Sequence, residues 1–305
     1  MLSIIITSLN EKPQILNQTI RSILDTSPED IEIIVIDDCS DTPVNLEYKG
    51  KNIKFERNKF RIGVAQSRHI GATLASKKWL LFTDAHMKFK HDWYNNFIEY
   101  QKLSTDKTIY NGTCLGLWEG EFEKELDLEK LPKYCGARLS LHEEKENQIL
   151  EGKWTGVKNE DYYPISCLMG AIYFIRKNYF FNLRGLSDLR MWGSDEPCLS
   201  LKTLLSGGEI IQLKNVKVAH LFRGEAPYRT ANKWMVYNKI RMAKTLLPDD
   251  MGELLISKLP KDRILEETWP EIEKDRGEIL EYKNYYKSIF NKDIKEICEK
   301  YKIKI

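Results

Sequence analysis

The chain has 305 residues, of which 42% are hydrophobic and 30% charged, so it can bury a large core beneath a polar surface. A net charge of only +2 argues against binding to polyanions through overall charge, and no apolar run approaches the length of a membrane span. Six scattered cysteines without a C-x-x-C pair are typical of reduced thiols. We therefore expect a cytoplasmic protein that does not contact a membrane.

The first hundred residues predict a parallel sheet. Three largely apolar runs without alternation predict buried strands, over residues 2–6, 32–36 and 79–82, and residues 53–55 predict a further short strand. Helices are expected between them, one beginning at Pro13 and one over residues 64–74. Three of the strands end in polar or acidic residues, and ligands of open α/β sheets bind at the carboxyl ends of strands. This part of the chain therefore looks like a nucleotide-binding half.

The basic residues are concentrated in this half. Between Tyr48 and His91 there are eleven Lys or Arg residues and only two acidic ones. Such a stretch suits a phosphate-bearing ligand or a nucleic acid, and a solvated basic face explains most of the lysines equally well.

The remainder of the chain is mixed. Residues 115–163 have weak periodicity and predict no clear element. Further elements are expected after them: a strand over 169–175, a helix capped by Ser194 and running to Leu205, strands over 209–213 and 216–220, a helix from Asn232, and a charged helical tail over 249–305.

Three residues at predicted strand ends have the chemistry of metal ligands. Asp84 and His86 follow the strand over 79–82, and His220 ends a later strand. A carboxylate and imidazoles can share a Mn²⁺ or Mg²⁺ ion that neutralises a leaving diphosphate. Each residue alone is weak evidence, because an Asp that caps a turn beside a surface His is the more common arrangement.

Six motifs in order extend this interpretation. They are TSLNE after the first strand, IIVIDDCSD, RIGVAQSRHIGA, LLFTDAH, MWGSDEPCLSLKTLLSGGEI and VAHLFRGEAPY. Over Ser3 to about Tyr228, their content and order resemble the catalytic domain of the polypeptide N-acetylgalactosaminyltransferases, which have the GT-A fold. The resemblance implies an α/β protein with a Rossmann-like, mixed but mostly parallel sheet and helices on both faces, followed by a helical C-terminal tail.

The resemblance also implies a metal-dependent glycosyltransferase with a UDP-sugar donor, such as UDP-GalNAc, UDP-GlcNAc or UDP-glucose. Asp84, His86 and His220 would hold Mn²⁺ or Mg²⁺, and Arg223 and Tyr228 would contact the diphosphate. Thr7, Asp38 and Arg61 would face the nucleotide, and the other residues expected on the donor side are Asn10, Glu11, Arg68, Asp84 and Gly170. Arg68 suits a structural ion pair equally well.

Trp192, Asp195 and Glu196 are the expected catalytic residues. Trp192 would line the donor sugar, unless it is a plain core residue. An acidic residue at 195 or 196 is the general base in inverting relatives of this fold, whereas in the resembled family the leaving diphosphate is thought to receive the proton. The Asp-x-His signature and the Trp-Gly element favour retention.

The acceptor is left open by departures from the resembled family. We expect a catalytic domain over 1–228, with a nucleotide-binding half (1–110) and an acceptor and sugar half (111–228), and a helical extension over 229–305. We expect neither the family's anchor nor its lectin domain, and the long loop that follows Pro-Tyr in the family is missing between Tyr228 and the helix from Asn232, which puts a Ser/Thr acceptor in doubt. A bacterial or phage-infected cell then suggests a hydroxymethylpyrimidine in DNA as acceptor, with a polypeptide as the alternative.

Two further hypotheses compete with this reading. One is an inverting glycan transferase that uses Asp195 or Glu196 as base. The other is a binder of nucleotides or nucleic acid without catalysis, for which steep salt dependence would be expected.

Overall fold

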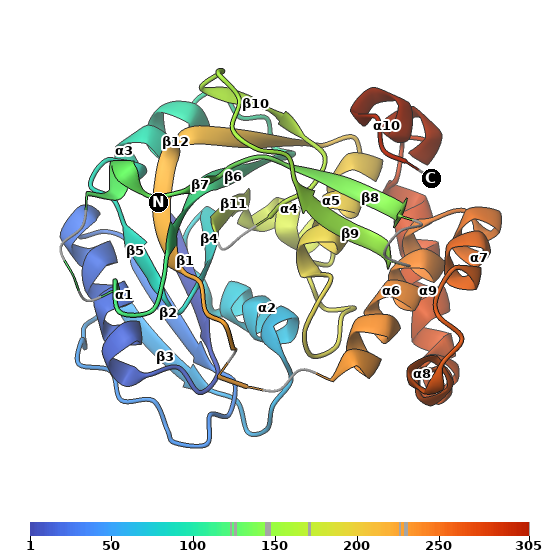
Figure 1. Ribbon diagram of the computed structural model, residues 1–305, viewed down its shortest axis with the longest axis horizontal. Helices are drawn as coiled ribbons and strands as arrows, with labels where there is room; N and C mark the ends of the chain where they lie inside the picture. The colour runs from blue at the N-terminus through green and yellow to red at the C-terminus, as the bar shows by residue number, and fades with distance from the viewer. Residues whose placement is uncertain are drawn as a thin grey trace.

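The computed structural model describes residues 1–122, 124, 127–143, 148–169, 172–225, 227–228 and 231–304. Within these ranges ten strands form one mixed sheet and two form a separate hairpin (Figure 1). The main sheet contains β1 (Leu2–Ser8), β2 (Glu32–Asp37), β3 (Ile53–Arg57), β4 (Trp79–Asp84), β5 (Met87–Phe89), β6 (Thr108–Leu117), β7 (Lys133–Tyr134), β10 (Tyr162–Ile165), β11 (Ile172–Arg176) and β12 (Glu209–Leu221). The hairpin is β8 (Ala137–Glu143) with β9 (Gln148–Trp154).

The strand order places three polar strand ends side by side. Along the sheet the order is β10-β12-β6-β11-β4-β1-β2-β3, and β1 is parallel to both β2 and β4. Thr7 therefore lies opposite Ile36 on one side and Asp84 on the other. β11 runs antiparallel between β4 and β6, so the sheet is mixed, as expected.

Helices cover both faces of the sheet because the strands are apolar on both sides. Leu2, Ile4 and Ile6 of β1 pack with α1 (Pro13–Thr26) and α3 (Trp93–Gln101). Ile5 packs on the other face in a larger core that includes α2 (Val64–Leu74), α4 (Lys177–Asn182) and α5 (Asp195–Leu205). The absence of alternation in the sequence of this strand thus reflects burial on both faces.

Most predicted elements are present, with three differences. The strands expected over 209–213 and 216–220 are one strand, β12, with an irregularity between Gln212 and Lys217. Ser194 precedes α5 but its side chain makes no capping hydrogen bond, because its backbone is left-handed (φ 68°). The strand expected over 169–175 begins at Ile172, and Gly170 lies outside the described residues.

The segment 115–163 contains structure that its sequence pattern did not predict. It includes β7, the β8–β9 hairpin and β10, together with a short 3₁₀ turn at Leu128–Lys130. In β8 the buried side chains of Leu139 and Leu141 face the larger core.

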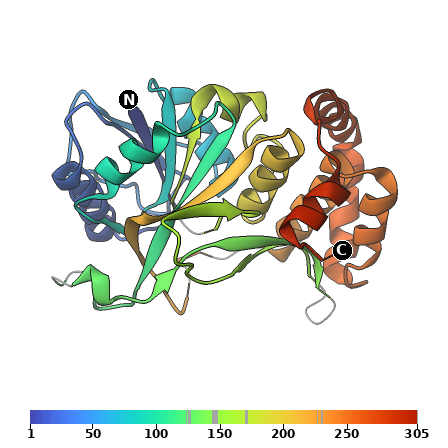
Figure 2. The ribbon, with the colours of Figure 1, turned by 90° about the horizontal axis from the view of Figure 1, so that it is seen from above.

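Five helices follow the sheet and pack beside it as a separate layer (Figure 2). They are α6 (Asn232–Leu246), α7 (Asp249–Ser257), α8 (Arg263–Lys274), α9 (Arg276–Ile289) and α10 (Ile294–Tyr301). Their buried side chains, such as Ile240 and Tyr286, belong to the same core cluster as Ile5 of β1. Among the described residues, no helix combines the length and apolarity needed to cross a bilayer. The division at residue 228 stays a prediction.

Two buried charged side chains, Glu32 and Lys202, are paired with residues of opposite charge and lie away from the carboxyl ends of the parallel strands. Glu32 accepts hydrogen bonds from Ser3 and Ser76 and pairs with Lys54. Burial raises the pKa of Glu32, but these partners outweigh it and lower the pKa to about 2. Elsewhere Lys202 of α5 pairs with Asp188 at 2.7 Å, and both side chains are almost completely buried.

Candidate functional site

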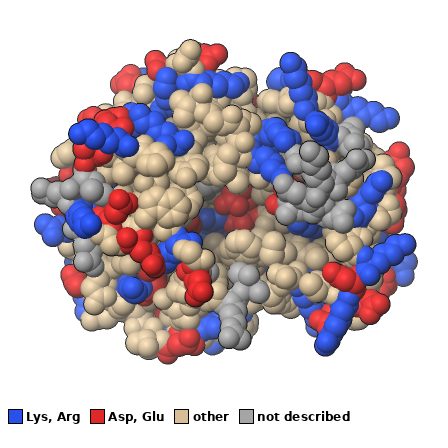
Figure 3. Space-filling model, in the orientation of Figure 1, with Lys and Arg blue, Asp and Glu red and all other residues tan. Residues whose placement is uncertain are grey.

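A cavity of about 560 Å³ opens at the carboxyl ends of β1 and β4. Its walls come from these strand ends, the segment before α5, the end of β12 and the start of α6. In the space-filling view a hollow lies near the centre of this face, with acidic side chains in its depth (Figure 3). The topology explains its position, because the carboxyl ends of neighbouring parallel strands meet at this edge.

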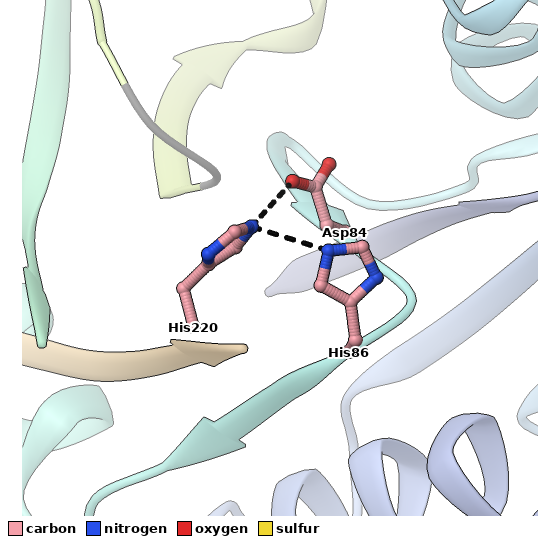
Figure 4. A group of neighbouring side chains, drawn as sticks. All are labelled: Asp84, His86 and His220. Carbon is pink, nitrogen blue, oxygen red and sulfur yellow. Dashed lines mark hydrogen bonds and ion pairs between the residues drawn. The ribbon is translucent and has the colours of Figure 1, made fainter. Parts of the chain in front are cut away.

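Asp84, His86 and His220 converge on one point of the cavity wall (Figure 4). Asp84 ends β4, His86 follows in the turn to β5, and His220 lies near the end of β12. β5 pairs with β12, which brings the two histidines together. The Nε2 atom of His220 lies 3.4 Å from Oδ2 of Asp84 and 3.2 Å from Nε2 of His86.

Glu11 fixes the orientation of His86. Its carboxylate lies 2.9 Å from Nδ1 of His86. The same carboxylate accepts hydrogen bonds from both terminal nitrogens of Arg223, at 2.8 and 2.9 Å. Because an ionised carboxylate can only accept, the proton of the neutral ring is on Nδ1 and the lone pair of Nε2 faces His220. Burial raises the pKa of Glu11, but hydrogen bonds from His86 and Arg223 outweigh it and leave that pKa lowered.

The donor set suits a divalent cation. One carboxylate oxygen and two imidazole nitrogens all lie within 4.8 Å of one another. Nε2 of His220 lies 3.2 Å from Nε2 of His86 and 3.4 Å from Oδ2 of Asp84. Both distances are close to the ~3 Å that separates adjacent ligand atoms around an octahedral cation with ~2.1 Å bonds. Burial lowers the pKa of His220, which favours the neutral ring that a metal requires. These residues therefore fit Mn²⁺ or Mg²⁺.

Arg68 connects the metal ligands to the two carboxylates expected at the catalytic position. Its guanidinium is buried, donates to Asp84 at 3.0 Å and to Glu196 at 3.1 Å, and pairs with Asp195. Burial and the neighbouring Asp195 carboxylate raise the pKa of Glu196 to about 8. Arg68 is thus an ion-pair partner, and it also lines the cavity, so the structure is compatible with both roles expected for it.

The other predicted donor-side residues divide into two groups. Thr7, Asp38, Arg223 and Tyr228 line the cavity. The Asp38 carboxylate accepts the backbone amides of residues 62 and 63 at 2.9 and 2.8 Å, so it also shapes the turn before α2.

Asn10 and Arg61 are not among the residues that line the cavity. Both side chains instead bind Asp41, at 2.8 and 2.6 Å. Gly170 lies outside the described residues. Trp192, with 40% of its surface exposed, lines the cavity as expected for a residue beside a ligand and not for a core residue.

Several wall residues were not singled out from the sequence. Three methionines, Met169, Met191 and Met235, line the cavity together with Glu151 of β9. Glu151 pairs with Lys239 of α6. These residues come from four segments that meet only in the fold, and although Met191 begins one of the six motifs, nothing in the sequence relates it to the other three.

Phe222 was part of a recognised motif but received no role. It lines the cavity two residues after His220, and its ring contacts those of Trp118 and Tyr134 with centroids 5.7 and 5.0 Å apart. Tyr134 in turn contacts Trp154 at 5.7 Å. We call these four residues the aromatic row, and it leads from the cavity onto the outer surface, where Trp118 is half exposed.

Sequence comparison relates the chain to glycosyltransferases. Residues 3–117 match the model of Glycosyl transferase family 2. Putative polypeptide N-acetylgalactosaminyltransferase 13 of Drosophila melanogaster is 27% identical in an alignment of 249 positions that covers 72% of this chain and 41% of the relative. Human polypeptide N-acetylgalactosaminyltransferase 16 is 29% identical in an alignment of 258 positions that covers 76% of this chain and 45% of the relative. The chain spans less than half the length of these relatives.

Structural comparison agrees. The crystal structure of GalNAc-T7 with UDP, GalNAc and Mn²⁺ superposes with a TM-score of 0.74 at 19% identity, covering 99% of this chain and 57% of the other. A structure of S. aureus TarS in complex with UDP-GlcNAc gives a TM-score of 0.52 at 10% identity, covering 84% and 70% of the two chains. These matches confirm the predicted GT-A fold, the resemblance to the polypeptide N-acetylgalactosaminyltransferases and the relationship to glycosyltransferases.

Proposed function

We propose that the chain transfers a sugar from a UDP-sugar to an acceptor hydroxyl with the help of a divalent metal ion. The observation that carries the proposal is the convergence of Asp84, His86 and His220 at the wall of a cavity at the carboxyl ends of the parallel strands. The relative with the same fold was crystallised with UDP, GalNAc and Mn²⁺, which supports this donor class and this metal.

Each side of the cavity has a role in binding the donor. Thr7 and Asp38 would contact the uridine, and Arg223 and Tyr228 the diphosphate. Arg223 is held by two hydrogen bonds to Glu11, so its guanidinium is oriented before a ligand arrives. When bound by its three ligands, Mn²⁺ or Mg²⁺ would supply Lewis-acid stabilisation of the charge on the leaving diphosphate. Trp192 would pack against the sugar.

The surroundings of Asp195 and Glu196 favour transfer with retention of configuration at the anomeric carbon. In the reaction the acceptor oxygen forms a bond to the anomeric carbon, the bond from that carbon to the diphosphate breaks, and the acceptor proton must be taken up. Asp195 is buried and paired with Arg68, and the pKa of Glu196, raised to about 8, keeps that carboxyl mostly protonated near pH 7, so neither group is an available base there. We propose that the proton goes to the leaving diphosphate. Inversion, with Glu196 as base, is the alternative.

We propose a polypeptide hydroxyl as acceptor, as the names of the curated relatives suggest. The aromatic row offers ring faces beside the cavity on which an apolar part of such an acceptor can pack. The hydroxymethylpyrimidine in DNA, which was expected mainly because the long loop after Pro-Tyr is missing, is the alternative, since a base can also stack on these rings. It is weaker because Lys54, Arg57 and Lys90 of the basic stretch are paired with carboxylates.

The decisive experiment combines donors, metal and acceptors. Purified protein is incubated with UDP-GalNAc, UDP-GlcNAc or UDP-glucose and Mn²⁺, and release of UDP is measured with peptides, glycans or hydroxymethylated DNA. We expect turnover with one donor that is lost on chelation and in Asp84→Asn. Metal-independent turnover would overturn the metal site. Binding of UDP without turnover of any donor would favour a non-catalytic binder. The configuration of the product's anomeric carbon distinguishes retention from inversion.

A further inference from the structure

The segment over residues 184–194, here called the site loop, has a strained backbone. Five of its residues have a left-handed backbone, with φ between 50° and 103°: Arg184, Gly185, Met191, Gly193 and Ser194. Three of them are neither Gly nor Asn, so the conformation costs free energy and persists only where neighbouring groups hold it. The loop joins α4 to α5 and carries Trp192 into the cavity.

Two amide side chains hold the loop from opposite sides. Gln66 of α2 donates to the carbonyls of Ser187 and Leu189 at 2.8 and 2.6 Å. Asn238 of α6, which is completely buried, donates to the carbonyls of Arg190 and Gly193 at 2.9 and 2.8 Å. Its Oδ1 also accepts the amide of Arg190 at 2.8 Å. Asn238 therefore satisfies three backbone groups around Trp192 in a region that water does not reach.

Asn238 does not line the cavity itself, but its neighbours on α6 and in the site loop do. Met235, one helical turn before it, packs against Gly193 and lines the cavity. Asn238 itself is not among the cavity-lining residues. Any effect on chemistry must therefore pass through the site loop, which presents Trp192 and leads directly into Asp195 and Glu196.

We propose that Asn238 is a positioning residue that fixes the site loop, and with it Trp192, at the sugar end of the cavity. The C-terminal helices then contribute to catalysis through α6, although the metal ligands lie in other elements. The inference rests on the proposed function for its kinetic consequence. The nucleotide end is formed by residues of β1 and the segments after β2 and β12, and none of the hydrogen bonds of Asn238 reaches them; the site loop meets this end only through Met191, which lies against Gly63.

The test compares Asn238→Ala and Asn238→Asp with a matched control, Asn17→Ala. Asn17 is also a buried asparagine on a helix with three backbone hydrogen bonds, to Pro13, Asn45 and Glu47, but it does not line the cavity. The aspartate variant keeps the size of the side chain and its acceptor oxygen, but it replaces the donor NH₂ group by an oxygen that faces the carbonyls of Arg190 and Gly193. It therefore removes the two donated bonds and adds repulsion without opening a cavity, whereas the alanine variant opens a cavity without adding charge.

Two kinds of measurement are made on the whole chain. Hydrogen exchange, without ligands, follows the amide of Arg190 and its neighbours in the site loop. Kinetics with the active UDP-sugar give kcat, and calorimetry gives the Kd of UDP with Mn²⁺. We expect faster loop exchange and a kcat about tenfold to a hundredfold lower in both Asn238 variants, as for a misplaced sugar contact, with the Kd of UDP nearly unchanged.

Asn17→Ala should lower the melting temperature but keep kcat within about twofold, as expected for a distant, independent site. Equal loss of kcat in Asn17→Ala and Asn238→Ala would overturn the proposal, because the effect would then reflect general destabilisation. Unchanged loop exchange in both Asn238 variants would also overturn it. If the unmodified protein transfers no sugar, the proposed function fails, whereas hydrogen exchange still decides whether Asn238 holds the loop.

Discussion

Replacing Glu11 by Gln is the sharpest test of the metal site. The substitution keeps the size of the side chain and removes its negative charge. In the protein this carboxylate accepts from Nδ1 of His86 at 2.9 Å and from both terminal nitrogens of Arg223 at 2.8 and 2.9 Å. A glutamine offers one acceptor oxygen and a donor NH₂ group, so it cannot serve all three donors.

The expected loss follows from these contacts. Removing a carboxylate that orients a metal-binding histidine commonly weakens the metal site 10–100-fold, which corresponds to about 1.4–2.7 kcal/mol of binding free energy. Arg223 loses its partner as well, so the affinity for UDP should fall in addition to the affinity for Mn²⁺.

Calorimetric titration with Mn²⁺, alone and with UDP, measures both effects. Glu32→Gln is the control, because Glu32 is an equally buried carboxylate with several partners but lies away from the cavity. It should leave both affinities unchanged. If Glu11→Gln binds Mn²⁺ as tightly as the unmodified protein, His86 is not a ligand held through Glu11 and the reasoning fails.

Three further predictions concern stability. The pKa of Glu32 is lowered to about 2, so its contribution is complete above the unfolded value near 4.5 and is lost as pH falls towards 2. Glu32→Gln should therefore lower the free energy of unfolding by ~2–3 kcal/mol at pH 7 and by progressively less in acid. Urea denaturation at several pH values measures this loss, and a loss that does not change with pH would contradict the prediction. Gly63 has φ +89°, and a Cβ there would lie 2.0 Å from the backbone of the site loop, so Gly63→Ala should cost at least ~1–3 kcal/mol in thermal unfolding. Gly50→Ala, with open space around it, should cost far less, and equal losses would refute the steric argument. Lys202→Met leaves Asp188 buried and unpaired and should cost ~3–5 kcal/mol, whereas adding Asp188→Asn should restore part of the loss; a double variant less stable than the single one would exclude this account.

The sheet was predictable because its strands are buried on both faces. Residues 2–6, 32–36 and 79–82 are continuous apolar runs, and they form β1, β2 and β4 with their polar ends together. Local pattern was sufficient for these strands. The candidate metal ligands stand at or just after strand ends, but each alone is weak evidence, and they were chosen together through the resemblance carried by the six ordered motifs.

The remainder depends on contacts between distant segments. Glu151 and Met235 reach the cavity from β9 and α6, and no spacing in the sequence relates them. Asn238 resembles any polar residue of an amphipathic helix until the site loop packs against it. The role of Arg68 was left open for the same reason, since its three carboxylate partners come from β4 and α5.

The anchoring of the site loop has a consequence for synthesis. Asp84, His86 and His220 have all been translated by residue 220, whereas the loop anchor Asn238 comes later. Tyr286, which donates to Asp188 within the loop, comes later still. Because chains fold from the N-terminus as they emerge, the sheet and the metal ligands can assemble while the loop is still unanchored. A nascent chain would thus gain its candidate metal site before the proposed sugar end of its cavity is in place.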